Sequence, residues 1–128
     1  MVFNRCVEPI LEISYCDSEI KFARSVKFLG VFIDDNLKWS EHIDYITSKI
    51  NESYYALLRV RHTLTMESMW TIYFGIIYSH LSYNVLLWGN ALESDRVFIS
   101  QKRIVRLILG LGHRETCEPH FIEHGLLT

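Results

Sequence analysis

The chain of 128 residues has little of several residue types that mark particular protein classes. Its two prolines and six glycines form no low-complexity tract or domain-splitting linker, which excludes fibrous and disordered classes. The three cysteines are an odd number without a Cys-x-x-Cys pair, so we expect reduced thiols and an intracellular location rather than a disulfide scaffold. Residues 1–5 lack the apolar run of a signal peptide.

An excess of basic residues is also missing, because the formal net charge is −2. Autonomous tight binding of nucleic acid usually needs such an excess, although local basic faces remain open. Hydrophobic residues make up 49% and aromatic residues 13%, as expected of one globular domain. Residues 69–92 carry no formal charge and could span a bilayer by length, but Ser79, His80, Ser82 and Asn84 lie at their centre. A buried helix is therefore favoured over a membrane span.

The first 39 residues have the alternation of β-strands. Leu11, Ile13 and Tyr15 predict a half-buried strand, residues 16–19 a turn, and Ile20 and Phe22 the return strand. Residues 26–33 are more uniformly apolar and predict a more buried strand, in which Gly30 indicates a bulge or a close backbone approach.

From Ser40 onward the spacing of apolar residues becomes helical. Ser40 is the expected cap of a helix over residues 41–62, with its apolar stripe at Ile43, Ile46, Ile50, Leu57 and Leu64. Thr65 should cap a central, most buried helix that ends at Gly89-Asn90. Ser94 or Asp95 should cap a third helix, with Val97, Ile104 and Ile108 inside and Gly110 and Gly112 at its end. Residues 118–124 are the expected start of a fourth, with Pro119 in its first turn.

These patterns predict an α+β fold: a small antiparallel β-sheet over about residues 1–35, followed by a bundle of three to four α-helices. We divide the chain into residues 1–39 and a helical region, residues 40–128. The apolar ending Leu126-Leu127-Thr128 suggests a truncated chain.

One acidic motif deserves weighing as a catalytic site. Phe32-Ile33-Asp34-Asp35 has the form aromatic-x-Asp-Asp, which holds two divalent cations in polymerase palms. Such a site needs a further carboxylate from a strand well upstream, and only 31 residues precede Phe32. A turn that ends a strand, with solvated carboxylates, is the favoured interpretation, so we expect no catalytic residue here.

A second cluster has spacing close to that of zinc ligands. Its members are His113, Cys117, His120 and His124. However, Cys117 begins a helix, and no second cysteine pair can close a structural site. We therefore expect surface histidines and one buried thiol, and no metal site or cofactor in this chain.

The third feature is basic. Lys102, Arg103 and Arg106 share one helix face, with Arg114 beyond, and Lys49, Arg59 and Arg61 form a second patch. Contact with phosphates is the functional interpretation, and a solvated helix face is the alternative. No Gly-rich phosphate loop or Ser/His/Asp arrangement indicates a small-molecule substrate.

Taken in order, these segments resemble the reverse transcriptases of non-LTR retrotransposons of the jockey and CR1 kind. Residues 1–4 resemble the strand after the catalytic box. Residues 26–34, 37–39 and 42–43 are similar to the signature "yLGv.iD..L.W..Hi". Further matches follow at residues 58–62, 81–83, 88–89, 101–106, 116–121 and 125–127. Asn84 departs from the family, which usually has Gly there, and Ser79 departs from a common Pro.

The resemblance implies that residues 1–39 are the end of the palm and residues 40–128 a thumb. Phe28, Leu29 and Gly30 would be the hairpin that grips the primer. Lys49, Arg59, Arg61, Lys102, Arg103 and Arg106 would contact an RNA/DNA template–primer. The catalytic aspartates, Mg²⁺ and nucleotides would belong to parts of the parent enzyme not present here, so this chain alone should be inactive. Two alternatives remain: a stand-alone helical module that binds RNA or protein, and a small membrane protein.

Overall fold

The computed structural model describes residues 13–15, 18–20, 23–112 and 114–126. Two antiparallel strand pairs precede the helices: β1 (Ile13–Tyr15) with β2 (Ser18–Ile20), and β3 (Ser25–Phe28) with β4 (Val31–Asp34). The predicted α+β class is confirmed, with the β-structure divided into two hairpins. The expected turn at residues 16–19 and the alternation at Leu11 and Phe22 lie partly or wholly outside the described residues.

Residues 26–33 form a hairpin, and the expectation of a single buried strand was wrong. Leu29 and Gly30 make a two-residue turn with φ angles of 46° and 85°, both in the left-handed region that such turns require. Glycine adopts this conformation without steric cost, which accounts for Gly30. Val26 and Phe28 are 41% and 61% exposed, so only β4, through Val31, reaches the core.

Asp34 connects the hairpin to the first long helix, α1 (Ser40–Val60). Its carboxylate accepts hydrogen bonds from the backbone N–H groups of Lys38 (2.7 Å) and Trp39 (2.9 Å). These bonds hold a connection in which Leu37 and Trp39 both have positive φ, a conformation that costs non-glycine residues free energy. The prediction that Ser40 caps the helix was wrong, because Trp39 occupies the cap position. Ser40 lies inside the first turn, where its Oγ donates to Glu93 Oε1 at 3.1 Å.

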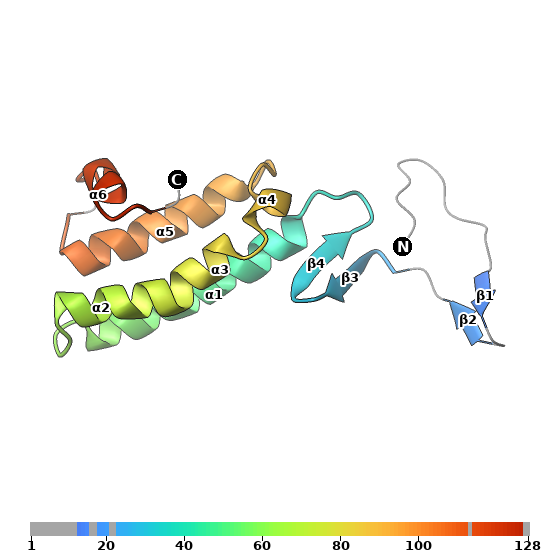
Figure 1. Ribbon diagram of the computed structural model, residues 1–128, viewed down its shortest axis with the longest axis horizontal. Helices are drawn as coiled ribbons and strands as arrows, with labels where there is room; N and C mark the ends of the chain where they lie inside the picture. The colour runs from blue at the N-terminus through green and yellow to red at the C-terminus, as the bar shows by residue number, and fades with distance from the viewer. Residues whose placement is uncertain (1–12, 16–17, 21–22, 113, 127–128) are drawn as a thin grey trace.

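The second helical segment is continuous from Met66 to Ser82 and reverses the direction of α1 (Figure 1). It comprises α2 (Met66–Ile72), a π-helical stretch η1 (Tyr73–Tyr78) and α3 (Ser79–Ser82). Thr65 caps it as predicted, because its Oγ1 accepts from the Ser68 N–H at 3.3 Å. Met69, Tyr73, Ile77 and Leu81 are buried at a constant spacing of four residues. In an α-helix, side chains four residues apart point in directions that differ by about 40° around the helix axis. The wider π turn reduces this angular difference, so the four side chains stay on one face.

This segment differs from the expected helix in two ways. It ends at Tyr83 and Asn84 rather than at Gly89, and a short α4 (Val85–Trp88) follows. Asn84 has φ of 52°, which explains why glycine suits this position and asparagine is tolerated there. The segment is also not buried on most sides, since Phe74 and Ile76 are 42% and 48% exposed. No helix within the described ranges is both long and apolar enough to cross a membrane.

The third long helix, α5 (Ser94–Leu109), packs along α1 and runs in the same direction (Figure 1). Its predicted inner residues Val97, Ile104 and Ile108 are buried. Neither Ser94 nor Asp95 caps it, because Glu93 occupies the cap position without a side-chain bond. The predicted stop at Gly110 is confirmed: φ is 68°, and the Leu111 N–H donates to the Arg106 carbonyl at 3.0 Å.

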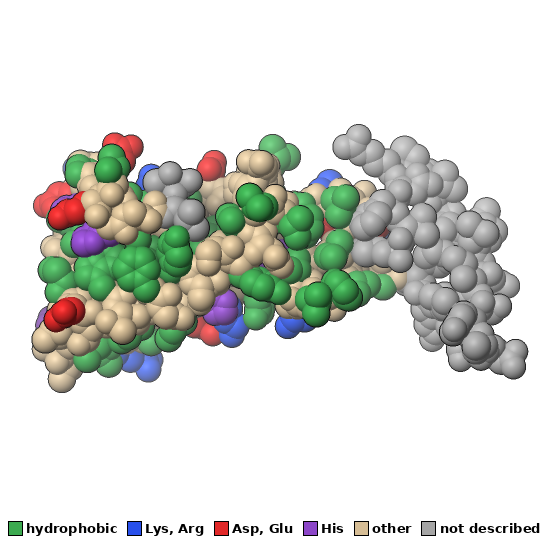
Figure 2. Space-filling model, in the orientation of Figure 1, with side chains coloured by type: hydrophobic (Ala, Val, Ile, Leu, Met, Phe, Trp, Pro, Cys, Tyr) green, Lys and Arg blue, Asp and Glu red, His purple; other side chains and the backbone are tan. Residues whose placement is uncertain are grey.

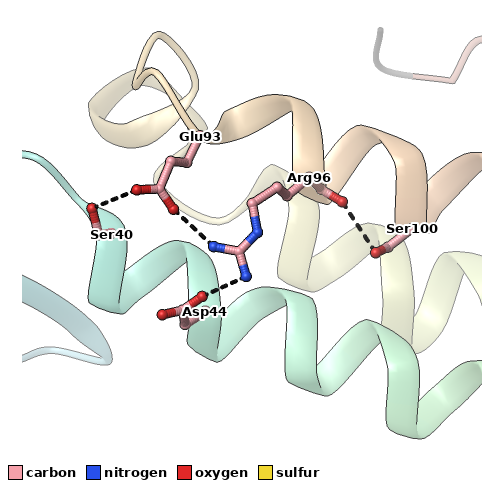
Figure 3. A network of polar contacts seen from close by, with 5 residues as sticks. All are labelled: Ser40, Asp44, Glu93, Arg96 and Ser100. Carbon is pink, nitrogen blue, oxygen red and sulfur yellow. Dashed lines mark hydrogen bonds and ion pairs between the residues drawn. The ribbon is translucent and has the colours of Figure 1, made fainter.

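A polar network joins the first turns of α1 and α5 (Figure 3). The Arg96 guanidinium contacts Asp44 and Glu93, each at 2.7 Å, and Glu93 also bonds Ser40. The two carboxylates raise the pKa of Arg96 by hydrogen bonding. The network fixes which turns of the two parallel helices lie side by side.

A final short helix, α6 (Glu118–Glu123), has Pro119 in its first turn, as predicted, and contacts α5 through the rings of Phe121 and Phe98. Phe121 and Leu126 are both buried in the core. Leu126 of the apolar ending is therefore covered by the helices, and Leu127 lies outside the described residues.

Removal of the Asp34 carboxylate should destabilise the fold, whereas removal of the adjacent Asp35 carboxylate should have little effect. We expect Asp34→Ala to lower the free energy of unfolding by about 1–2 kcal/mol, because two backbone donors lose a charged acceptor. Asp35→Ala is the matched control and should change it by less than about 0.5 kcal/mol. Urea unfolding of both variants measures the difference, and equal losses would contradict this role for Asp34.

Tyr73 should make the fold sensitive to alkali. Burial raises the pKa of Tyr73 to about 12, although the Gln101 Nε2–H, 2.9 Å from its hydroxyl, opposes the shift. An unfolded tyrosine ionises near pH 10, so the stabilisation is complete below about pH 10 and is lost as the pH rises toward 12. We expect a loss on the order of 2 kcal/mol over this range.

Urea unfolding as a function of pH tests this prediction. Tyr73→Phe should flatten the alkaline dependence, whereas Tyr55→Phe, at a side chain 58% exposed, should leave it unchanged. The same alkaline slope in the Tyr73 variant would show that another group is responsible.

Candidate nucleic-acid interface

Part of each basic patch found in the sequence lines one groove at the C-terminal ends of α1 and α5. The groove has a volume of about 490 Å³, and its basic members are Arg61 from the end of α1 and Arg103 and Arg106 from α5. The other lining residues are Tyr54, Leu58, Leu107, Gly110, Leu111 and Gly112. The parallel packing of the two helices brings these distant residues together, because it places both C-terminal ends at the same end of the molecule (Figure 1).

The arginines of this groove form no ion pair with a carboxylate among the described residues, although the Glu115 carboxylate lies beside the lining residue Gly112. No acidic residue is among the groove's lining residues. Within the described part of the chain, Arg61, Arg103 and Arg106 make no ion pair, whereas Arg96 makes two. Helix C-termini carry negative partial charge, so the arginines alone supply the positive potential.

Two arginines of the groove are held in place by other contacts. The Arg103 guanidinium lies over the Tyr54 ring, with its central carbon 4.5 Å from the ring centroid. The Arg106 Nε–H donates to the Glu115 carbonyl at 3.2 Å. Because each guanidinium has five N–H donors, these contacts orient the groups and leave donors for an oxyanion. One planar guanidinium group can donate two parallel hydrogen bonds to the oxygens of a phosphate.

The remaining predicted basic residues lie elsewhere. Lys49 pairs with Glu52 at 2.9 Å, and this bond raises the pKa of Lys49 while offsetting its charge. Lys102 lies over the Phe98 ring at 4.0 Å and does not line the groove. Arg59 and Arg114 are exposed, outside the groove lining. Of the six residues predicted to contact nucleic acid, the structure thus gathers Arg61, Arg103 and Arg106.

The hairpin turn at Phe28, Leu29 and Gly30 lies at the opposite end of the helices. Phe28 and Leu29 are 61% and 75% exposed, and Figure 2 shows hydrophobic side chains at the surface in this part of the molecule. The Tyr83 hydroxyl donates to the Leu29 carbonyl at 2.5 Å. The break after α3 therefore positions the turn, a contact between residues 54 apart that sequence patterns did not reveal.

Beneath this turn is a cavity of about 320 Å³, which sequence analysis missed. Leu29, Gly30, His42, Tyr45, Ile46, His80 and Tyr83 line it. His42 is 2% exposed, and its Nδ1 accepts from the Phe32 N–H at 3.5 Å. Its Nε2 has no hydrogen-bond partner among the residues that the structure describes. Burial lowers the pKa of His42, so the neutral ring is favoured and supports the hairpin by packing.

The Asp34-Asp35 pair has the contacts of a structural turn. Both oxygens of Asp34 accept backbone N–H groups, and Asp35 Oδ1 accepts from the Asn36 side-chain amide at 2.6 Å. The favoured interpretation of a turn at the end of a strand is confirmed, but Asp34 is bonded rather than simply solvated.

The cluster with zinc-like spacing is divided by the structure. Cys117 is 2% exposed and belongs to the core, as predicted. His113 lies outside the described residues. His120 and His124 lie together at the surface with Glu123, which the sequence analysis did not include.

Comparison with known proteins shows that the chain is related to the reverse transcriptase of a transposon. The relative is a probable RNA-directed DNA polymerase from transposon X-element of Drosophila melanogaster, 32% identical over 91 residues. The similarity covers 67% of this chain but 10% of the relative, so the chain spans about a tenth of that protein's length. No family model matches the chain, and no solved structure matches it significantly.

We expect the hydrogen bond between the Tyr83 hydroxyl and the Leu29 carbonyl to stabilise the hairpin of β3 and β4. Tyr83→Phe removes the hydroxyl alone, so the amides of β3 and β4 should exchange with solvent several-fold faster, since a net hydrogen bond contributes about 1 kcal/mol. Tyr55→Phe, far from the hairpin, is the control. Hydrogen exchange measures the effect, and unchanged protection of residues 25–34 would show that packing alone holds the turn.

Proposed function

We propose that this chain is part of a non-LTR retrotransposon reverse transcriptase of the jockey and CR1 kind, comprising the end of the palm and the thumb. The homology to a transposon RNA-directed DNA polymerase supports the enzyme class. The order of the motifs supports the subclass and the position within the enzyme. The role we assign is to hold the RNA/DNA template–primer, with the exposed Phe28-Leu29-Gly30 turn at the primer end and the arginine groove on the phosphates.

The observation that carries this proposal is the meeting of Arg61, Arg103 and Arg106 without an acidic neighbour in the groove lining. Contacts to the phosphate backbone position a nucleic acid without reading its sequence. A polymerase needs such binding because it must slide along any template. Beside its arginines the groove is lined by Tyr54, leucines and glycines, and the side chains that pair with adenine or cytosine (Asn, Gln, Asp and Glu) are not among these lining residues.

Catalysis is assigned to other parts of the parent enzyme. Both oxygens of the Asp34 carboxylate accept backbone N–H groups that hold the turn before α1, which is a structural role, and a two-metal site needs further carboxylates beside it. Mg²⁺ would be held by carboxylates outside this chain, and the chain alone would not copy nucleic acid.

Binding of a labelled RNA/DNA duplex with a recessed primer end tests the proposal. The double variant Arg103→Ala/Arg106→Ala should bind more weakly, and the slope of log K against log salt should fall by nearly 1 for each lost phosphate contact. Arg24→Ala, an exposed arginine just before the hairpin and outside the groove lining, should keep the slope of the unaltered chain.

Competition between ligands separates the proposal from the alternative of a stand-alone module. A thumb region should prefer the RNA/DNA duplex over single-stranded RNA of equal length. Preference for the single strand would favour an RNA-binding module, and equal salt slopes in the groove variant and the Arg24 variant would overturn the assignment of the groove.

A further inference from the structure

The last turn of α6 brings together three side chains that metal ions bind. Imidazole nitrogens of His120 and His124 and a carboxylate oxygen of Glu123 all lie within 4.8 Å of one another. His120 Nδ1 is 3.4 Å from Glu123 Oε2. Although His124 follows the last residue of the helix, its N–H donates to the His120 carbonyl at 3.1 Å. The two histidines therefore keep the i, i+4 spacing that places side chains on one helix face.

The backbone that carries these groups is fixed by the core. Phe121, between the two histidines, is 2% exposed and contacts Phe98 of α5, with ring centroids 5.7 Å apart. Leu126 is buried just after the helix, and its N–H donates to the Phe121 carbonyl at 2.9 Å. Ligands on a fixed backbone lose less conformational entropy when they bind a metal.

One imidazole ring is also oriented by a neighbouring helix. The His124 ring packs on Trp70 of α2, with centroids 4.3 Å apart and planes inclined by 37°. This contact restricts the ring of His124, and it places an indole fluorophore next to the candidate ligands. The side chains of His120 and Glu123 are 34% and 67% exposed, so an ion can reach them from solvent.

We propose that His120, Glu123 and His124 bind one divalent ion of the zinc type, with water completing its coordination. Two imidazole nitrogens and one carboxylate oxygen are a ligand set that Zn²⁺ accepts, and three protein ligands leave an open position. Bonds of about 2.0–2.1 Å require the ligand atoms to move somewhat closer together than they now lie; the exposed Glu123 side chain can make that adjustment. Cys117 is not part of the group, so this site differs from the one considered from sequence spacing, and it does not depend on the proposed function.

Titration calorimetry of the 128-residue chain with Zn²⁺ tests the site. We expect one ion per chain, with an affinity that His120→Ala lowers roughly tenfold or more because one of three ligands is lost. Glu123→Gln should lower it less, since the amide oxygen remains a weak donor. His62→Ala, at an exposed histidine outside the group, is the matched control and should bind like the unaltered chain.

Tryptophan fluorescence supplies a second readout that also locates the ion. Cu²⁺, which binds the same nitrogen ligands tightly, should quench the emission of the unaltered chain, and Trp70→Phe should remove most of the quenching.

Circular dichroism shows whether each variant keeps its helices, which we expect because the altered side chains are partly exposed. Zn²⁺ affinity that is unchanged in folded His120→Ala, or reduced equally in His62→Ala, would overturn the proposal. So would the absence of Zn²⁺ binding to the unaltered chain, or quenching that persists in Trp70→Phe.

Discussion

The parallel packing of α1 against α5 is the constraint on which the rest of this structure depends. The α1 residues Ile43, Ile46, Ile50 and Leu57 and the α5 residues Val97, Ile104 and Ile108 are all buried in one hydrophobic core where the two helices pack. Each buried aliphatic side chain contributes about 1.5–3 kcal/mol relative to exposure, so this contact outweighs the solvent-exposed polar bonds around it. The network around Arg96 adds register rather than much stability, because exposed ion pairs contribute little.

Parallel helices need a long return connection, and the segment from Met66 to Trp88 provides it. The π turn keeps Met69, Tyr73, Ile77 and Leu81 directed at the core along the whole return. The break at Tyr83 and Asn84 then frees the Tyr83 side chain to reach the hairpin turn. The position of the hairpin is thus a consequence of how the return helix ends, and Asp34 fixes the same hairpin from the α1 side.

The same packing creates the arginine groove. Two parallel helices end at the same level, so the positive side chains that favour helix C-termini accumulate at one end of the bundle. Within an antiparallel pair, Arg61 and Arg106 would lie at opposite ends. The groove is therefore a feature of topology, and it gives a chain of net charge −2 a local site with the charge that phosphates require.

The sequence by itself determined the helical stripes, the Thr65 cap, the Gly110 stop, the Pro119 start and the α+β class, because each depends on local spacing or local backbone chemistry. It also identified the basic residues and the resemblance to reverse transcriptases. The apolar pattern did not determine that residues 26–33 turn back at Leu29-Gly30, because a uniformly apolar run does not distinguish a buried strand from a hairpin; the hairpin at Phe28, Leu29 and Gly30 was implied by the resemblance alone. Only the tertiary structure decided that Asp34 holds the connection before α1 while Ser40 bonds Glu93. It also decided that three of the six predicted arginines and lysines share a groove, and that Glu123 rather than Cys117 accompanies His120 and His124. Those outcomes depend on contacts between residues far apart in the chain, or on side-chain directions, and neither is present in a pattern of residue types.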